Sequence, residues 1–523
     1  MEFLDDHGDG YIALALPVES GSIDFIKYKL MLEKIDQLLD QSHLESRLKE
    51  IAIKNEREED ERKKKERLKI IKENKGKKEE DRESVPVLRP KSDSQIRRYA
   101  SYALRCTIAR FLSQLSYRSF SVRLADSILL RDFCGYFSPH SPDETPSKST
   151  LQRFESQFDT ETLREVADML LLAASDEKSD LFNKHNGLLY RCDTDYLFLD
   201  STCAKLDIHF PVDWVLLKDS VKSIIQSIIQ IRSYGILHRM PTPEEFLSNV
   251  NNIAIQMSNS SNGPGSKKQR KTIFRKLKKI LRNTSEHGYR YLQKLESNWK
   301  DTDLSEAQKN QIVKKLKHTL DLVPDVIYQA EERIIGERQV PNDKKILSLH
   351  EEHAKVYNRG KAGSQVEFGL QLLLGENLDG MITHWDLYKN IPRPDYKHTQ
   401  DVINRIESMK EECRPHQLVG DRGFFSANSE KKIENADLIS NMCPKNPKVL
   451  KERLSDEGFK DVAKRRAQTE GRVGIMKNNF LGRKIRVHGF EAQERHVAWA
   501  VLAHNLWVLS RFPYIDLLED EAA

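Results

Sequence analysis

Apolar side chains recur at helical spacing in three stretches of the chain. Between residues 23 and 39 they return every three or four positions, which predicts an amphipathic helix with a partner surface. Residues 97–137 are dense in Leu, Phe and Tyr, and residues 491–510 place Trp499 and Leu502 on one apolar side. These stretches predict packed helices at both ends of the chain.

Short apolar runs predict buried strands elsewhere. They lie at residues 196–199, 344–350, 365–375, 380–388, 416–420 and 435–443, with a helical pattern at 399–410. The first run leads directly into Asp200, and the run at 416–420 leads into Asp421. Because α/β sheets place their chemistry at the carboxyl ends of strands, we expect both aspartates at strand ends in a functional site.

Composition changes along the chain and suggests its organisation. We expect an amphipathic helical segment at 1–46, a charged helix or linker at 47–90, a helical domain at 91–190 and an acidic tail at 513–523. A Pro-rich turn at 142–146 precedes a helix that Ser149 or Thr150 would cap. This turn and helix are compatible with a DNA-reading helix-turn-helix or with an ordinary helical bundle.

A mainly helical segment at 215–340 contains the most basic stretch of the chain. After a flexible linker at 258–266, residues 267–282 carry nine basic and no acidic side chains, with apolar residues on one helical face. Contact with nucleic acid is favoured over a solvated packing helix or a membrane-surface helix. The candidate DNA-binding residues are Lys268, Arg270, Lys271, Arg275, Lys278 and Lys279.

Length and composition restrict the class of protein. The 523 residues suggest two to four domains, and the net charge of +5 matters because it is unevenly distributed. Six cysteines without a CxxC pair argue against a zinc ribbon and against a disulfide framework. An acidic N-terminus and the lack of any run of 18 apolar residues favour a soluble protein of a reducing cytosol. No GxxxxGK[ST] motif for an NTP-driven motor occurs.

The stretch 463–477 combines two cations with a carboxylate. Arg466, Glu470 and Lys477 are spaced by four and seven residues, which places them within roughly 40° on one helical face. This layout suits a metal ion held beside a phosphate. The alternative is an ordinary pair of surface ion pairs, each worth only ~0.2–0.5 kcal/mol.

Asp200, Asp421 and Glu470 together supply three hard carboxylate groups from distant parts of the chain. Such a set can bind Mg²⁺ or Mn²⁺ and leave positions open for water and phosphate oxygens. Two such ions would serve in-line displacement at phosphorus. The residues therefore indicate phosphodiester chemistry.

Three motifs carry a family resemblance: LDST at 199–202, VGDRGF at 419–424 and RAQTEGRVGIMKN at 466–478. They resemble the DDE transposases of bacterial insertion sequences, and the likeness extends over roughly residues 95–510. The Tyr usual three residues before the Arg is Ala463 here, which puts the accessory role of that tyrosine in doubt. The three presumed metal ligands are all present.

The resemblance implies an α/β fold with an RNase H-like mixed sheet and flanking helices. Its core would comprise residues 191–214 and 341–512, interrupted by the helical 215–340 insertion and preceded by helices that bind DNA or dimerise. Asp200, Asp421 and Glu470 would hold two Mg²⁺ or Mn²⁺ ions, and Arg466 and Lys477 would contact DNA phosphates.

The same resemblance implies cleavage at insertion-sequence ends, followed by transfer of the 3′-hydroxyl into target DNA. The partners would be double-stranded end and target DNA and further copies of the chain in a homodimer or larger synaptic complex, in the bacterial cytoplasm near the nucleoid. Two alternatives stay open: a catalytically silent DNA-binding or scaffold protein, and a metal-dependent nuclease that cuts without joining.

Overall fold

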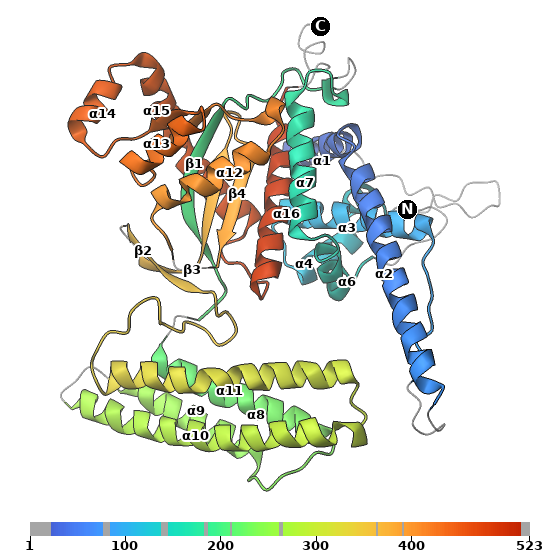
Figure 1. Cartoon of the computed structure of the whole chain (residues 1–523), viewed down its shortest axis with the longest axis vertical. Coiled ribbons are helices and arrows are strands. Elements are labelled where there is room, and N and C mark those ends of the chain that lie inside the picture. Colours follow the sequence, from blue (N-terminus) through green and yellow to red (C-terminus); the bar gives the residue numbers. More distant parts are fainter. Residues whose placement is uncertain are drawn as a thin grey trace. The chain divides into compact units, whose positions relative to one another are not determined.

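The computed structural model describes eight stretches of the chain. They are residues 22–76, 84–136, 145–182, 187–209, 212–260, 265–361, 364–389 and 392–513. Two compact units result (Figure 1), the first made of Met1–Ala204, Gln371–Leu387 and Arg393–Ala523, the second of Lys205–Leu370 and Tyr388–Pro392. Most of the expected acidic tail and residues 1–21 of the expected first segment lie outside the described residues.

The N-terminal part of unit 1 is helical. Its helices are α1 (Ile23–Gln41), α2 (Leu44–Asn74), α3 (Asp93–Ser113), α4 (Tyr117–Asp126), α5 (Ile128–Phe133), α6 (Lys148–Glu155) and α7 (Thr160–Ser175). A Ser or Asp side chain caps α3 to α7, each accepting a hydrogen bond from the backbone N–H three positions on. The cap expected at Ser149 or Thr150 is wrong, because α6 begins at Lys148 and Ser147 caps it.

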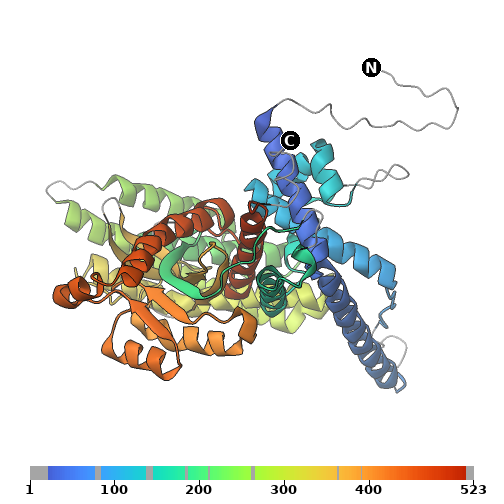
Figure 2. The same ribbon diagram turned by 90° about the horizontal axis from the view of Figure 1, so that it is seen from above.

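The charged stretch at 47–90 is helical as far as Asn74, within α2. Arg62 and Lys63, which lie three and four positions after Glu59 on the helix, both pair with it, and these side chains are exposed. Such pairs each contribute only a few tenths of a kcal/mol. Figures 1 and 2 show the last turns of α2 extending away from the other helices of unit 1. They form a solvated charged helix.

A buried carboxylate ties four of the helices of unit 1 together. Glu155, at the end of α6, accepts hydrogen bonds from Arg110 of α3 at 2.6 Å and from the Tyr117 hydroxyl of α4. His496 of α16 (Phe490–Leu509) lies 2.8 Å from its other oxygen. Burial opposes ionisation of Glu155, but attraction by Arg110 and His496 outweighs it and lowers the pKa to about 2.

The sheet has six strands within the described residues. They are β1 (Tyr196–Lys205), β2 (Lys355–Lys361), β3 (Ser364–Glu376), β4 (Ile382–Tyr388), β5 (Gln417–Gly420) and β6 (Ile439–Met442). Hydrogen-bonded neighbours run β2–β3–β1–β5–β6, and β4 also pairs with β3. β1, β5 and β6 are parallel, whereas β2 and β3 are antiparallel. This mixed sheet with flanking helices confirms the expected RNase H-like α/β class.

The strand expected at 344–350 is wrong. The Gln329 side chain of α11 (Glu306–Ile334) bonds both backbone groups of Ile346, at 2.8 Å and 3.1 Å. His318 of the same helix lies 3.0 Å from the Leu349 carbonyl. The backbone of this apolar segment is therefore satisfied by helix side chains instead of by a neighbouring strand.

Further helices flank the sheet within unit 1. They are α12 (Thr399–Ser408), α13 (Ala427–Asn435), α14 (Pro447–Arg453), α15 (Glu457–Ile475) and α16. Figure 1 shows α16 between the sheet and helices α7 and α3. Trp499 and Leu502 are fully buried there, and Asn505 bonds both backbone groups of Ile382 in β4 at 2.8 Å. This helix joins the sheet to the N-terminal helices.

Unit 2 contains a helical core of its own. Its long helices are α8 (Asp213–Ser233), α9 (Pro243–Asn259), α10 (Ser266–Asn298) and α11. Gly288 lets α10 approach its neighbours closely, since an added Cβ would lie 3.0 Å from both Ile224 and Leu320. In the described part of the chain, no helix is both long and apolar enough to cross a membrane.

Candidate active site

The helix α15 is anchored to the sheet by one face. Arg465 donates to Glu376 at the end of β3 over 3.0 Å, and the Thr469 hydroxyl donates to the same oxygen over 2.8 Å. The Arg465 guanidinium also lies 4.6 Å from the ring centre of Phe198 in β1. Because Glu376 and Thr469 are buried, these contacts fix the rotation of the helix about its axis.

Strand register brings the two aspartates together. β1 and β5 are parallel neighbours in which Tyr196 opposes Gln417 and Phe198 opposes Val419. Each pair is offset by 221 positions, and the same offset pairs Asp200 with Asp421, two residues beyond the last paired position. Neighbouring strands lie about 4.8 Å apart, so the two carboxylates begin from adjacent backbones.

The expected strand-end position holds for Asp421 and is wrong for Asp200. Asp421 directly follows β5, which ends at Gly420. Asp200 lies in the middle of β1, because this central strand pairs on both sides and continues through Ser201 and Thr202. The polar residues after the apolar run therefore show where β1 becomes less buried, and they do not show where it ends.

Tight packing shapes the turn that follows β5. The Gly423 N–H donates to Asp421 Oδ1 over 2.7 Å, which orients the carboxylate. At Gly420 an added Cβ would lie 2.5 Å from the Met442 sulfur and 3.0 Å from Phe424 Cβ. Any larger residue here would have to displace the side chains of Met442 and Phe424.

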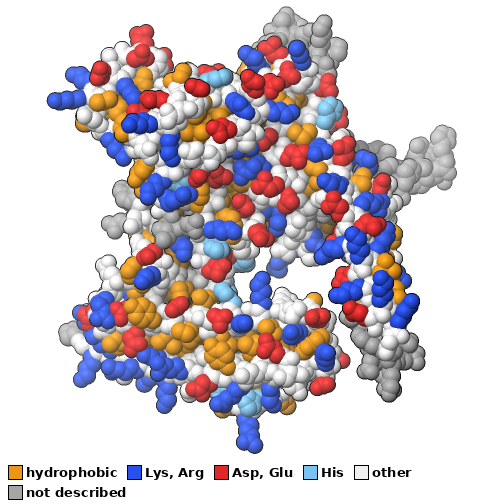
Figure 3. Space-filling view, in the orientation of Figure 1, with side chains coloured by type: hydrophobic (Ala, Val, Ile, Leu, Met, Phe, Trp, Pro, Cys, Tyr) orange, Lys and Arg blue, Asp and Glu red, His pale blue; other side chains and the backbone are white. Residues whose placement is uncertain are grey.

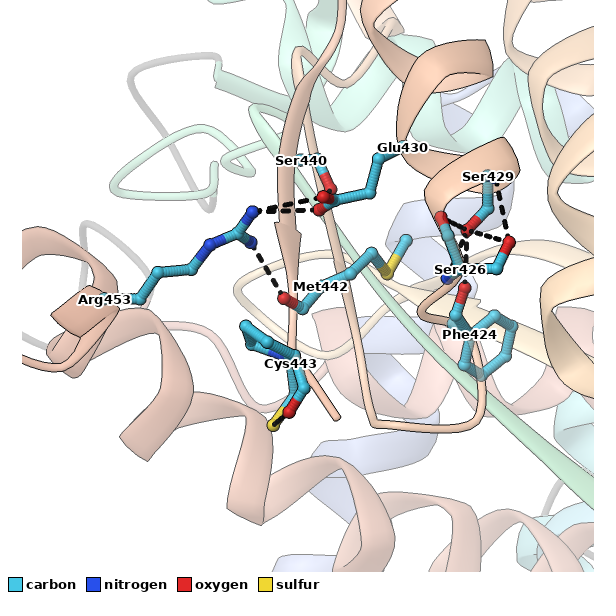
Figure 4. A network of polar contacts seen from close by, with 9 residues as sticks. Phe424, Ser426, Ser429, Glu430, Ser440, Met442, Cys443 and Arg453 are labelled. Atoms are coloured by element: carbon cyan, nitrogen blue, oxygen red, sulfur yellow. Dashed lines mark hydrogen bonds and ion pairs between the residues drawn. The ribbon is translucent and has the colours of Figure 1, made fainter. Parts of the chain in front are cut away.

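A network of polar contacts holds the next part of the turn (Figure 4). The Ser429 hydroxyl at the start of α13 donates to the Phe424 carbonyl over 2.9 Å. Arg453, at the end of α14, donates to Glu430 of α13 and to the Met442 carbonyl, each over 3.0 Å. The turn after Asp421 is thereby fixed to β6 and to α14.

Arg466 lies between two of the candidate acids. Its guanidinium is 3.8 Å from an Asp421 oxygen and 4.0 Å from a Glu470 oxygen. The Arg466 side chain is 20% exposed, whereas that of Glu470 is 63% exposed. The arginine links the turn after β5 to the free face of α15.

The titration of Asp200 reflects the same grouping. Burial of its carboxyl group is the main cause of a pKa raised to about 6, and repulsion by Asp421 adds to it. Attraction by Arg466 lowers the pKa, and Glu470 contributes a further repulsion. Because electrostatic interactions weaken with distance, Asp421, Arg466 and Glu470 must all lie near the carboxyl group of Asp200.

Lys477 lies beside β1, but it does not lie on the α-helical face that the sequence predicted. Helix α15 ends at Ile475, and Met476–Phe480 form a π-helical turn, so the α-helical arc expected for Lys477 is wrong. A π turn holds more residues than an α turn and rotates the following side chains. The Lys477 ammonium donates to Thr202 Oγ1 over 3.0 Å, two residues beyond Asp200 on β1.

The donor chemistry fits a hard divalent cation at the two aspartates. Asp200 and Asp421 offer carboxylate oxygens from adjacent strands, which Mg²⁺ and Mn²⁺ prefer. Across the described ranges, no three His, Cys, Asp or Glu side chains are gathered closely enough to hold a metal ion. The carboxylate of Glu470 on α15 lies 4.0 Å from the Arg466 guanidinium.

Asp395 is a fourth carboxylate at the site that the sequence analysis missed. Its Oδ1 accepts a hydrogen bond from the Ser201 hydroxyl. A Cβ on Gly423 would lie 2.6 Å from Asp395 Oδ2 and 2.9 Å from Asp421 Oδ1, so both acids border the same glycine. No apolar run precedes Asp395, and a search for strand-end acids therefore does not find it. Arg465 was missed as well, because its partner Glu376 is far away in sequence.

The basic candidates of α10 belong to unit 2 and fall into two rows. A paired row points to acids of the α11 segment: Lys271 lies 3.0 Å from Glu337 and Lys278 lies 2.6 Å from Glu331. The paired row consists of Lys267, Lys271 and Lys278. The exposed row consists of Lys268, Arg275 and Lys279. Arg270 is half-buried beside them.

The exposed row carries net positive charge. Within the part of the chain that the structure describes, Lys268, Arg275 and Lys279 form no ion pair, and they fall within about 40° on the helix. Figure 3 shows Lys and Arg side chains gathered along the α10 side of unit 2. A polyanion is the partner that this row suits.

A comparison with known families adds to this geometry. Residues 336–506 match the family model described as the transposase DDE domain. The match includes Asp421, Arg466, Glu470 and Lys477, and Asp200 lies before it. Neither a curated protein nor a solved structure matches the chain significantly.

Proposed function

We propose, from the match of residues 336–506 to the transposase DDE domain model, that the protein cuts DNA at the ends of a mobile element and transfers the freed 3′-hydroxyl into target DNA. The family match supports DNA cleavage of the transposase type in general, without the details of the reaction. The observation that best supports the full reaction is the parallel β1–β5 pairing, whose register extends towards Asp200 and Asp421, together with the influence of Asp421 and Glu470 on the pKa of Asp200.

In this proposal Asp200, Asp421 and Glu470 hold divalent metal ions, Mg²⁺ or Mn²⁺. When bound, such ions make the attacking oxygen a better nucleophile and neutralise the leaving oxygen. Arg466 orients Asp421 and Glu470 through its contacts at 3.8 Å and 4.0 Å. Asp395 fixes Ser201 next to Asp200 through its hydrogen bond with that hydroxyl.

Lys477 and Arg466 are also the cations that would meet the DNA. Lys477 is half-buried and is held at Thr202 over 3.0 Å, so its charge is placed beside β1 before any DNA arrives. A fixed cation orients a phosphate with less loss of side-chain entropy than a mobile one. We therefore assign Lys477 to the phosphate next to the bond that is cut.

A joining assay tests the proposal against its two alternatives. The full-length protein with Mg²⁺ should join a pre-cut duplex with a 3′-hydroxyl, taken from the DNA that borders its gene, to a supercoiled plasmid. Nicked and linear plasmid carrying the label is the expected product. Cleavage without labelled plasmid would support a nuclease, and binding without cleavage would support a silent scaffold protein.

The exposed row of α10 should strengthen DNA binding without reading sequence. Replacing Lys268, Arg275 and Lys279 with Gln should weaken binding to every duplex, because lysine and arginine contacts with phosphates release counterions. The slope of log affinity against log salt should flatten by up to about 2.7, or 0.9 for each lost phosphate contact. Fluorescence anisotropy in EDTA over a salt series measures this slope.

The paired row provides the matched control. Replacing Lys267, Lys271 and Lys278 with Gln removes the same charge, but these lysines already face Glu337 and Glu331. The salt slope should change much less than in the exposed-row variant. Equal effects of the two variants would show that general charge, and not a contact along the exposed row, governs binding.

A further inference from the structure

A basic cavity of about 450 Å³ lies within unit 1, beyond the candidate active site. One wall is the end of α3 and the turn into α4, with Arg110, Gln114 and Tyr117. The other wall is the chain that follows α15, with Asn478 and Asn479 and then the loop 482–487. Its volume is within the range of about 300–1,000 Å³ that is typical of ligand sites.

The loop 482–487 is anchored by one buried residue and exposes its charged side chains. Gly482 and Gly489 have positive φ angles of 75° and 85°, which bracket the loop with sharp turns. Ile485 is buried and anchors the loop, whereas Arg483 and Arg486 on either side of it are exposed. Arg483 and Arg486 therefore lie on the solvent side of the loop, on either side of its buried residue.

The charge of the cavity is one-sided. Arg483, Lys484 and Arg486 line it together with Arg110, and none of the described residues that line it is an aspartate or glutamate. The charge of Arg110 is balanced by buried Glu155. Arg483 and Arg486 form no ion pair within the described ranges. Two arginines are therefore available to an anion from solution.

Neutral hydrogen-bond donors accompany these cations. Asn478 and Asn479 line the same cavity, whereas the Tyr117 hydroxyl in its wall already donates to Glu155. Phosphate oxygens accept from side-chain amides and hydroxyls as well as from arginine, whose planar fork binds them in pairs. A mixed set of this kind suits a phosphodiester backbone, which presents an anionic group at each step along a strand.

One wall of the cavity includes the residues that directly follow Lys477 in the chain. Asn478 follows Lys477, whose ammonium is fixed on Thr202 two residues from Asp200. The π-helical turn Met476–Phe480 leads the chain from that lysine into the cavity wall. One short segment of the chain therefore carries both Lys477 and part of the cavity wall.

We propose that this cavity binds the phosphate backbone of the DNA next to the cleaved bond, with Arg483 and Arg486 as its principal contacts. This inference rests on the proposed function for the position of the bond, but DNA binding by the cavity can be measured without any cleavage. Its role is to hold the DNA in line with Lys477 and the acidic residues.

The test compares two charge-matched double variants of the full chain in EDTA. Arg483→Gln/Arg486→Gln should bind the end duplex at least tenfold more weakly, with a salt slope lower by about 1.8, or 0.9 for each contact. Lys65→Gln/Lys72→Gln, which removes two exposed charges from α2, should bind like the wild type. Arg483→Lys/Arg486→Lys should recover most of the salt slope because both charges return.

Ethylation interference then locates the contacted phosphates. Ethyl groups on a few phosphates next to the cleaved bond should block binding of the wild type but have little effect on Arg483→Gln/Arg486→Gln. Inorganic phosphate, compared with chloride at equal ionic strength, should not displace the DNA; specific displacement at millimolar phosphate would show a site for the free ion and overturn the inference.

The outcomes separate this inference from the proposed function. If the glutamine variant keeps wild-type affinity, salt slope and interference pattern while the wild type cuts DNA, the cavity is not a DNA site and the proposed function stands. If the variant binds weakly as expected but the wild type never cuts, the cavity binds DNA and the proposed function falls. A wild type that binds no DNA overturns both.

Discussion

Asp421→Asn is expected to abolish metal-dependent cleavage of end DNA while leaving DNA binding in EDTA nearly unchanged. The same result is expected for Asp200→Asn and Glu470→Gln. Each change keeps the side chain almost the same size but removes one carboxylate charge from the group that attracts the cation. Cleavage should fall by at least about 100-fold, as is typical when one preorganised charge-stabilising group is lost. Strand cleavage of a labelled duplex measures this loss.

Stability provides the fold control for these variants. Because the pKa of Asp200 is raised to about 6 from an ordinary value of 3.8, its ionisation costs the folded protein stability, and this loss grows as pH rises from 3.8 and is complete above pH 6. Metal-free Asp200→Asn should therefore be more stable than the wild type at pH 8, by at most about 3 kcal/mol, and lose this advantage below pH 4.

Substantial metal-dependent cleavage by any one of the three variants would remove that residue from the site.

Glu155→Gln is expected to destabilise unit 1 by about 3–5 kcal/mol at pH 7, because it leaves the buried charge of Arg110 without its partner. The folded pKa of Glu155 is about 2, below the ordinary value of 4.5, so its contribution is complete above pH 4.5. This contribution is lost as pH falls towards 2. Urea unfolding of wild type and variant between pH 7 and pH 3 should show the difference narrowing.

Glu58→Gln is the matched control for this substitution. Glu58 is exposed on α2, and the same chemical change there should alter the free energy of unfolding by less than about 0.5 kcal/mol. A difference between Glu155→Gln and wild type that stays constant from pH 7 to pH 3 would contradict the lowered pKa. Loss of volume or shape, rather than loss of charge, would then explain the destabilisation.

The local sequence pattern was sufficient to predict features that depend on a single strand or helix. The apolar runs at 196–199 and 416–420 became β1 and β5, because strands buried in a central sheet need continuous apolar side chains. The four-residue spacing of Arg466 and Glu470 was equally informative, since both lie on α15 before its end and their side chains come within 4.0 Å. Neither inference needed a distant partner.

Local pattern failed where backbone hydrogen bonds had a choice of partner. Residues 344–350 have the apolar composition of a strand, but Gln329 and His318 of α11 take their backbone groups. Lys477 was placed by α-helical geometry, and the π-helical turn after Ile475 changed its direction. Both outcomes depend on the packing around the segment, which the segment itself does not encode.

By itself the sequence determined which side chains are available: the acids Asp200, Asp421 and Glu470, the cations beside Glu470 and the basic face of α10. The tertiary structure alone decided which of them lie close together. The β1–β5 register brings the segments that carry Asp200 and Asp421 side by side, and Glu337 and Glu331 pair with Lys271 and Lys278. Register and helix pairing are set by contacts between residues far apart in the chain, so no local spacing can specify them.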